Sequence, residues 1–268
     1  GNLSFVFNGR YDQFTSSDVA DKNYAGTEYG GTTTIDQNEF SGRVAAMYTF
    51  DSGYRVYANY SESFEPVSGT DAETGKAFTP TTADQIEAGV KYQSQDGDVT
   101  FNVAYFVLTK ENVVVNTPDF GKKTQTGEIE SKGVEFEINA ALTDNLTLIA
   151  NYTNLDMKIT ENELDPLLVG KTPVWVADQT ASAWVNYYLD QGALNGLMIG
   201  LGARYVGETQ LDQYNTDTVP SYTLVDLVAS YDLAINSSLI SDMTLAFSVS
   251  NLSDKTYVGA CYDMNNCW

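Results

Sequence analysis

Hydrophobic and polar residues alternate along most of this chain, and the run that begins at Met243 shows the pattern clearly. One side of this run is apolar and consists of Met243, Leu245, Phe247 and Val249. The residues between them are small or polar. A period of two residues is typical of a β-strand with one apolar and one polar face. The pattern therefore predicts a strand here.

The same alternation recurs in ten earlier segments. With the run from Met243, the eleven predicted strands are 3–14, 40–50, 54–64, 84–94, 99–114, 127–142, 146–159, 174–189, 197–209, 222–234 and 243–250. Segments rich in Leu or Ala at helical spacing are absent from the sequence. The sequence therefore predicts an all-β protein.

The connections between these strands alternate between long and short. The short ones carry Asp, Asn or Gly, as in Asp51-Ser52-Gly53 and Asp144-Asn145, which are signals for tight hairpin turns. In an up-and-down antiparallel sheet, all the long connections leave from the same end. Outer-membrane β-barrels have this asymmetry, with short turns on one side of the membrane and long loops on the other.

The two predicted faces differ in chemistry. In segment 127–142, Val134, Phe136 and Ile138 alternate with Glu135, Glu137 and Asn139. Repeated ionised side chains on one face favour a water-filled lumen, and the apolar face then faces lipid. Aromatic residues near the strand ends fit interfacial girdles; they are Tyr48, Phe50, Tyr54, Tyr92, Tyr187, Tyr188 and Tyr231. The alternative is a soluble β-sandwich or a large secreted β protein. The loop asymmetry and the two-faced chemistry favour the transmembrane antiparallel barrel.

Composition narrows the function. The net charge is −22, from 36 acidic and 14 basic residues, so the surface repels nucleic acid. The chain has no His, the commonest general base and transition-metal ligand. Two Cys without a His make a poor zinc site, so a disulfide between Cys261 and Cys267 in an oxidising compartment is the better interpretation. The chain begins at Gly1 and stops at Trp268, and we expect it to be a fragment of a longer protein.

Several segments resemble those of TonB-dependent siderophore receptors, in the order in which that family carries them. They are YANYSESFEP at 57–66, PTTADQIEAGVKY at 80–92, GEIESKGVEFE at 127–137, KTP followed by ASAW at 171–184, and NLSDKTY at 251–257. The pair Cys261 and Cys267 is similar to the loop disulfide of the ferrichrome and hydroxamate branch.

The resemblance implies a fold and a function. The whole chain, 1–268, corresponds to a C-terminal portion of a 22-stranded barrel without its plug domain or last strand. The implied activity is uptake of a ferric siderophore, of hydroxamate type, across the bacterial outer membrane. The implied partners are the TonB complex, which acts through the missing N-terminal region, together with membrane lipid and lipopolysaccharide. No enzyme activity is expected.

Ligand contacts are expected from aromatic residues in the long loops, because a siderophore brings its own iron ligands and needs shape and aromatic surface instead. The candidates are Tyr262, Trp268, Tyr214, Phe120, Phe78, Tyr29 and Tyr24. The stapled loop of the hydroxamate branch lies near the ligand, so the resemblance puts Tyr262 first. No cofactor held by side chains and no metal site is expected.

Other interpretations remain open at this point. The acidic pairs Glu128/Glu130 and Glu135/Glu137 could be a general acid and base, but lumen solvation or contacts with a plug fit them better. The loop acids Asp71, Glu73, Asp212 and Asp217 could bind Ca²⁺, although they lack EF-hand spacing. Alternative functions are a passive porin-like channel, a phage or adhesin-type surface barrel, and a secreted β enzyme.

Overall fold

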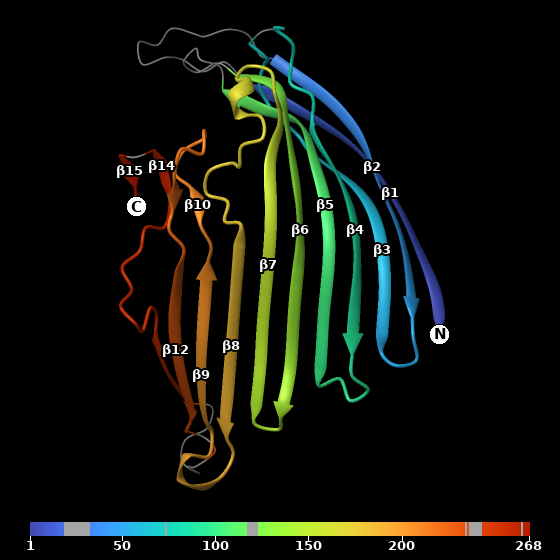
Figure 1. Cartoon of the computed structure of the whole chain (residues 1–268). Coiled ribbons are helices and arrows are strands. Elements are labelled where there is room, and N and C mark those ends of the chain that lie inside the picture. Colours follow the sequence, from blue (N-terminus) through green and yellow to red (C-terminus); the bar gives the residue numbers. More distant parts are fainter. Residues whose placement is uncertain (19–32, 73, 117–122, 234, 236–242, 264) are drawn as a thin grey trace.

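A computed structural model describes residues 1–18, 33–72, 74–116, 123–233, 235, 243–263 and 265–268. One antiparallel sheet dominates it (Figure 1). Its eleven strands are β1 (Asn2–Asp18), β2 (Thr33–Thr49), β3 (Tyr54–Glu65), β4 (Thr81–Gln93), β5 (Val99–Asn116), β6 (Lys123–Thr143), β7 (Leu146–Asn162), β8 (Gln179–Leu189), β9 (Leu197–Val206), β12 (Tyr222–Asp232) and β13 (Thr244–Val249).

Strands that follow one another in this sheet are paired in chain order, as predicted, and β1 and β13 form its two edges. Two small hairpins, β10 (Thr209–Gln210) with β11 (Thr218–Val219) and β14 (Cys261–Asp263) with β15 (Asn266–Cys267), lie outside the sheet. The 3₁₀ turns η1 (Pro166–Leu168) and η2 (Gly192–Leu194) complete the regular structure of the described residues.

The strand predictions were right in the number and order of the sheet strands, but several boundaries were wrong. The largest difference is in β2, which begins at Thr33 and not at the predicted residue 40. Two other predicted segments are shorter in the sheet. The segment predicted as 174–189 becomes a strand only at Gln179, because Trp175 has a φ of 68° and interrupts the extended backbone. The segment predicted as 197–209 ends at Val206, and Thr209 pairs instead with Val219 in the β10–β11 hairpin. In both places the chain leaves the sheet to build a loop.

The long connections gather at one end of the sheet and the short turns at the other (Figure 1). At the short-turn end, Thr143 pairs directly with Leu146 across the turn. Gly53 and Gly97 turn with φ values of 89° and 84°, which only glycine adopts at little cost. The predicted loop asymmetry is therefore confirmed, and we call the end with the long connections the loop end.

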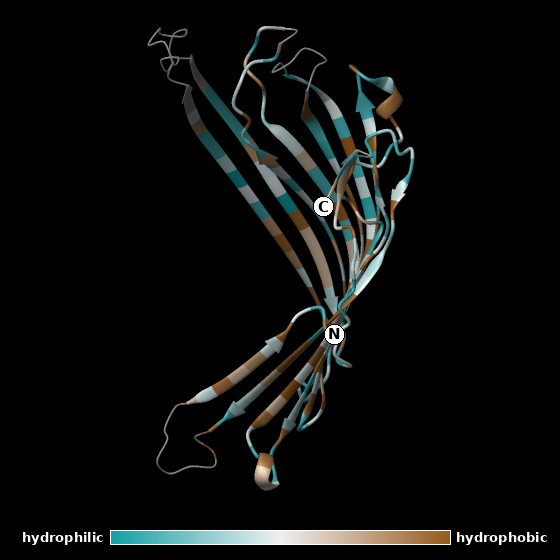
Figure 2. Cartoon of the chain, turned by 90° about the vertical axis from the view of Figure 1, so that its left-hand side faces the viewer, coloured by the Kyte–Doolittle hydropathy of each residue, from teal (hydrophilic) through white to brown (hydrophobic). Residues whose placement is uncertain are grey.

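The register puts apolar residues beside apolar residues. One row across the sheet joins Leu3, Tyr48, Val56, Val90, Val103, Phe136 and Tyr152. The neighbouring row on the opposite face joins Arg55, Lys91, Asn102, Glu137, Asn151, Ser182 and Arg204. We call the first face outer and the second inner. Figure 2 shows the alternation as teal and brown bands along the strands.

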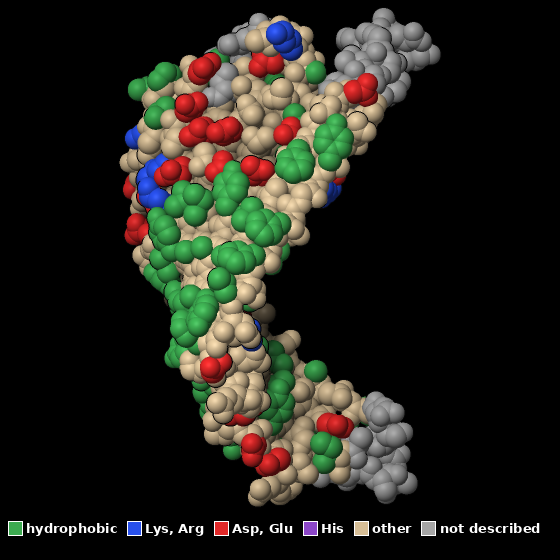
Figure 3. Space-filling model, turned by 90° about the vertical axis from the view of Figure 1, so that its right-hand side faces the viewer, with side chains coloured by type: hydrophobic (Ala, Val, Ile, Leu, Met, Phe, Trp, Pro, Cys, Tyr) green, Lys and Arg blue, Asp and Glu red, His purple; other side chains and the backbone are tan. Residues whose placement is uncertain are grey.

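The outer face carries an apolar band. Hydrophobic side chains gather over the middle of the sheet, with Asp and Glu side chains above them toward the loop end (Figure 3). Near the short turns, Tyr92 packs on Tyr54 at 4.6 Å and on Phe101 at 5.3 Å between ring centroids. This arrangement suits a wall with lipid on one side and aromatic residues at the membrane boundary.

The sheet is a single layer, so few side chains are enclosed. The buried hydrophobic residues of the described part are Phe78, Ala104, Ala140, Val219, Leu224 and Cys261. Three of them, Phe78, Val219 and Cys261, lie outside the main sheet in the loops and small hairpins. Among the residues that the structure describes, no helix has the length and apolar character needed to cross a membrane.

Candidate functional site

The loop end holds every described residue that the sequence proposed for ligand contact. Tyr24, Tyr29 and Phe120 lie outside the described residues, and the side chain of Tyr262, which belongs to β14, does too. The described candidates are Phe78 in the β3–β4 loop, Tyr214 in the β9–β12 loop, and Trp268 at the end of the β14–β15 hairpin. These three have very different surroundings.

Phe78 is almost completely enclosed, with 3% of its surface exposed. Its ring lies over Gly69, where an added Cβ would be 3.1 Å from a ring carbon, and its backbone N–H donates to Gly69 O at 3.2 Å. Its carbonyl accepts a hydrogen bond from the Gln37 side chain of β2. In this structure Phe78 packs the β3–β4 loop against itself.

Asp71 fastens the same loop to the start of β6. Its carboxylate accepts hydrogen bonds from Thr124 Oγ1 at 2.5 Å, from Gln125 N at 2.9 Å, and from Thr74 N at 2.8 Å and Oγ1 at 3.0 Å. These donors, that of Thr124 above all, hold the pKa of Asp71 well below its ordinary value of 3.8. Asp71 is therefore a charged anchor between the β3–β4 loop and β6.

Gln125 adds a second connection. Its Oε1 accepts from Thr79 N at 2.9 Å, and its Nε2 donates to Thr79 O at 2.7 Å and to Asn112 O at 2.8 Å. Asn112 has a φ of 56° at an irregularity of the β5–β6 pairing. The β3–β4 loop is thereby held on the loop end of the β5–β6 pair.

The Ca²⁺ interpretation of the loop acids gains no support. Hydrogen-bond donors surround Asp71, and Asp212 accepts from Tyr214 N at 2.9 Å and from Thr216 N at 3.2 Å. These bonds, and a bond from the Thr216 hydroxyl that contributes most, lower the pKa of Asp212. Glu73 lies outside the described residues. Within the described ranges, no group of three or more His, Cys, Asp or Glu side chains could hold a metal.

Tyr214 and Asn215 connect the β9–β12 loop to the β7–β8 loop. Tyr214 Oη donates to Asp165 Oδ2 at 2.9 Å, and this bond raises the pKa of the Tyr214 phenol. Asn215 makes two bonds to the backbone of Thr172, at 2.8 and 2.9 Å. Tyr214 is 40% exposed, so its ring remains available while its hydroxyl is engaged.

The predicted disulfide is present. Cys261 and Cys267 are bonded at 2.02 Å and face each other across the β14–β15 pair. Trp268 N donates to Ala260 O at 3.0 Å, and Gly259 N donates to Trp268 O at 2.7 Å. We call residues 259–268 the stapled hairpin. Trp268, at its end, is 67% exposed.

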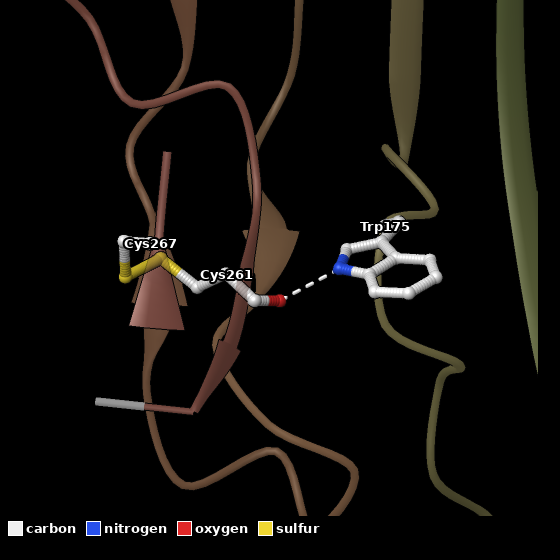
Figure 4. Close-up of a disulfide and its surroundings, with 3 residues drawn as sticks. All are labelled: Trp175, Cys261 and Cys267. Atoms are coloured by element: carbon white, nitrogen blue, oxygen red, sulfur yellow. Dashed lines mark hydrogen bonds between the residues drawn. A yellow bond between two sulfur atoms is a disulfide. The ribbon is translucent and has the colours of Figure 1, made fainter. Parts of the chain in front are cut away.

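Trp175 contacts the stapled hairpin from the β7–β8 loop. Its Nε1 donates to Cys261 O at 2.8 Å, and the indole points toward the hairpin (Figure 4). Its ring meets that of Trp268 edge-on, with 6.1 Å between centroids. Trp175 was not among the predicted contact residues, because the alternating pattern assigned it to a strand. The nearby Thr172-Pro173 was a signal for a break before it.

Glu130 lies on the opposite face of β6 from Glu135 and Glu137. Glu135 and Glu137 are on the inner face, in register with Thr153 and Asn151. Glu130 shares the outer face with Phe136, where its carboxylate accepts from Lys132 Nζ at 3.2 Å. Glu128 accepts from Thr160 Oγ1 at 2.6 Å. The expectation that both pairs face the lumen was therefore wrong for Glu130, because it lies six positions, an even number, before the lipid-facing Phe136 in the same strand.

Residues 1–252 match the family described as "TonB dependent receptor-like, beta-barrel". The chain is 38% identical over 264 residues to the ferrioxamine B receptor of Salmonella typhimurium, covering 98% of the chain and 36% of that protein. It is 36% identical over 261 residues to the ferrichrome outer membrane transporter/phage receptor of Escherichia coli K12, covering 97% and 33%.

Solved structures agree on the fold. The siderophore receptor PiuA from Acinetobacter baumannii superposes with a TM-score of 0.81 at 24% identity, over 99% of this chain and 38% of that one. The ferric citrate transporter FecA in the unliganded form gives 0.77 at 21% identity, over 100% and 40%. The chain spans about a third of the length of the curated relatives named above. By its match over residues 1–252 and its identity to these relatives, the chain belongs to the TonB-dependent receptor β-barrel family.

Proposed function

We propose that this chain is the C-terminal part of the barrel of a receptor that takes up a ferric siderophore of hydroxamate type. The observation that carries the proposal is the stapled hairpin at the loop end of the sheet, in a chain 38% identical to a ferrioxamine B receptor. The two relatives named above are a ferrioxamine B receptor and a ferrichrome outer membrane transporter.

Family membership settles the general class. TonB-dependent receptors are outer-membrane receptors and transporters rather than enzymes, and the chain is an outer-membrane protein. The two-faced sheet suits that location, because an apolar outer face can contact lipid while a polar inner face stays in water.

The ligand chemistry supports the same proposal. A ferric siderophore already saturates its iron, so a receptor needs aromatic surface and hydrogen bonds and not metal ligands. The loop end offers the exposed rings of Trp268 and Tyr214. Tyr262 remains the first predicted contact because it belongs to the stapled hairpin, whereas the enclosed Phe78 would need the β3–β4 loop to open.

The partners follow from the same role. We propose that a plug domain occupies the inner side of the complete barrel and that the TonB complex supplies the energy for transport through it. Inner-face charges such as Arg55, Lys91 and Glu137 would face that plug. Membrane lipid would cover the apolar band, and lipopolysaccharide would surround the strands nearer the loop end.

The proposal is tested on the complete receptor, purified in detergent, by titrating ferric hydroxamates and ferric catecholates and following tryptophan fluorescence. Quenching by submicromolar ferric hydroxamate, weakened by Tyr262→Ala, is the expected result. Binding of catecholates alone would change the ligand class. Steady conductance in planar bilayers without binding of any ferric chelate would indicate a passive channel and overturn the proposal.

A further inference from the structure

We infer that Trp175 is a positioning residue: it fixes the stapled hairpin in the place from which the hairpin contacts the ligand. The effect on ligand binding rests on the proposed function, whereas the contact between Trp175 and the hairpin does not depend on it. Trp175 and Cys261 lie 86 residues apart in the chain and belong to different loops. Their hydrogen bond therefore joins the β7–β8 loop to the stapled hairpin.

The buried carbonyl group of Cys261 explains why an indole is needed at position 175. Cys261 is 2% exposed, so its carbonyl has little access to water. Buried carbonyl groups in proteins nearly always have a hydrogen-bond partner, and an unpaired one destabilises the conformation that buries it. Trp175 supplies that partner through Nε1 at 2.8 Å. A phenylalanine ring could fill much of the same space but has no N–H to donate.

The backbone of Trp175 is shaped to aim the indole. Its φ of 68° lies in the left-handed region, which bulky residues adopt only where the surroundings hold them. The chain becomes extended again by Gln179, where β8 begins. The left-handed conformation turns the side chain out of the strand's alternation and toward the stapled hairpin (Figure 4).

The β7–β8 loop that carries Trp175 is itself anchored. Asn215 pairs with the backbone of Thr172, three residues before Trp175, and Tyr214 donates to Asp165. At the base of the same loop, Gly170 N donates to Ile159 O at 2.8 Å, and Ile159 N donates to Lys171 O at 2.9 Å. The two loops therefore hold Trp175 in place, and Trp175 in turn holds the hairpin.

A ligand that binds a preorganised hairpin does not lose affinity to ordering it. Releasing the hairpin should weaken binding mainly by speeding ligand dissociation, as most changes within one interface do. The effect should depend on the hairpin being a single stapled unit. In a Cys261→Ser/Cys267→Ser background, Trp175 has a less ordered partner, so its substitution should matter less.

The test uses the complete receptor in detergent, with Trp175→Phe as the variant and Trp184→Phe as the matched control. Trp184 lies on the inner face of β8, where its Nε1 donates to Asn186 Oδ1 at 2.6 Å, away from the hairpin. Three quantities are measured: amide hydrogen exchange in residues 259–268, the rate at which a phosphine reduces the disulfide, and the affinity for iron-55-labelled ferric hydroxamate.

For Trp175→Phe we expect faster exchange, faster reduction and about tenfold weaker binding with faster dissociation, as loss of one buried hydrogen bond predicts. Trp184→Phe should leave all three unchanged, and the double-serine background should shrink the effect of Trp175→Phe on affinity. Unchanged exchange and reduction in Trp175→Phe would overturn the inference. If binding is nevertheless weaker in that case, Trp175 contacts the ligand directly instead. If the wild-type receptor binds no ferric chelate, the proposed function fails, while exchange and reduction still decide whether Trp175 holds the hairpin.

Discussion

The side-chain amide of Asn215 pairs with both backbone groups of Thr172. Its Oδ1 accepts from Thr172 N at 2.8 Å, and its Nδ2 donates to Thr172 O at 2.9 Å. An amide side chain that satisfies an N–H and a C=O of the same residue acts like an added strand residue. The β7–β8 and β9–β12 loops are thereby joined at the point from which Trp175 reaches the stapled hairpin.

Replacing Asn215 should release these two loops from each other. Asn215 has a φ of 55°, so Asn215→Gly keeps the backbone conformation and removes only the side-chain bonds, whereas Asn215→Ala adds backbone strain. Loss of the pair should cost the loops about 1–3 kcal/mol of local stability. The readout is hydrogen exchange of the Thr172 amide, which should speed up about tenfold or more in both variants.

Asn145 provides the control for that experiment. Its Nδ2 donates to Tyr188 O at 2.8 Å, at the opposite end of the sheet. Asn145→Ala removes a similar side-chain-to-backbone bond there and should leave exchange of the Thr172 amide as in the wild type. Equal exchange in Asn215→Gly and the wild type would contradict the loop connection.

The attachment of the β3–β4 loop should weaken only in acid. The donors around Asp71 lower the pKa of its carboxyl below the ordinary value of 3.8. The stability that this carboxylate contributes is therefore complete above that value and is lost as the pH falls toward the folded-state pKa. Limited proteolysis of residues 66–80, measured from pH 6 downward with an acid-stable protease, should remain slow until the pH is below about 4.

Asp71→Asn should expose the same loop at neutral pH, because the amide carries no charge and accepts through only one oxygen. The matched control is Asp96→Asn, in the β4–β5 turn at the opposite end, where the carboxylate accepts from Asp98 N at 3.1 Å. Cleavage of residues 66–80 should rise severalfold in Asp71→Asn and stay at the wild-type rate in Asp96→Asn. Resistance of Asp71→Asn to cleavage at neutral pH would show that other bonds suffice to hold the loop.

Gly202 leaves room for Trp184 on the inner wall. A Cβ at Gly202 would lie 1.9 Å from Trp184 Cε3, so Gly202→Ala must displace the indole. Overpacking of this kind costs about 1–3 kcal/mol and should lower the temperature at which the barrel unfolds in detergent. Adding Trp184→Leu should recover much of the loss, since the smaller side chain makes room for the methyl group. If Trp184→Leu does not restore the unfolding temperature, glycine is needed at position 202 for its backbone conformation and not to make room for the indole.

Two adjacent residues of β13 should differ in how well they tolerate substitution by arginine. Phe247 is 60% exposed on the apolar outer face, whereas Ser248 points to the inner face. An arginine on the lipid side of a barrel costs up to about 2–4 kcal/mol near the membrane midplane, and lumen-facing positions tolerate it far better. Urea titration of the complete receptor folded into lipid vesicles should show Phe247→Arg as the less stable variant. Equal stability of Phe247→Arg and Ser248→Arg would reject the assignment of faces.

Much of the fold could be predicted because its signals are local. Alternation in segments such as 54–64 fixes which residues share a face, and Asp-x-Gly at 51–53 fixes a turn. Strand β3 accordingly runs from Tyr54 to Glu65, within one residue of the prediction. The prediction was wrong where a loop interrupts an alternating pattern, at Trp175 and after Val206, because periodicity alone does not reveal a left-handed backbone.

The sequence by itself determined the strand order, the two faces, the loop end and the cysteine pair, since each depends on neighbouring residues and short-range geometry. The tertiary structure decided which loops hold one another. Asp71 reaches Thr124, Asn215 reaches Thr172, and Trp175 reaches Cys261. These partners are 43 to 86 residues apart. Their pairing exists only after the sheet has brought the loops to one end, and therefore no local pattern encodes it.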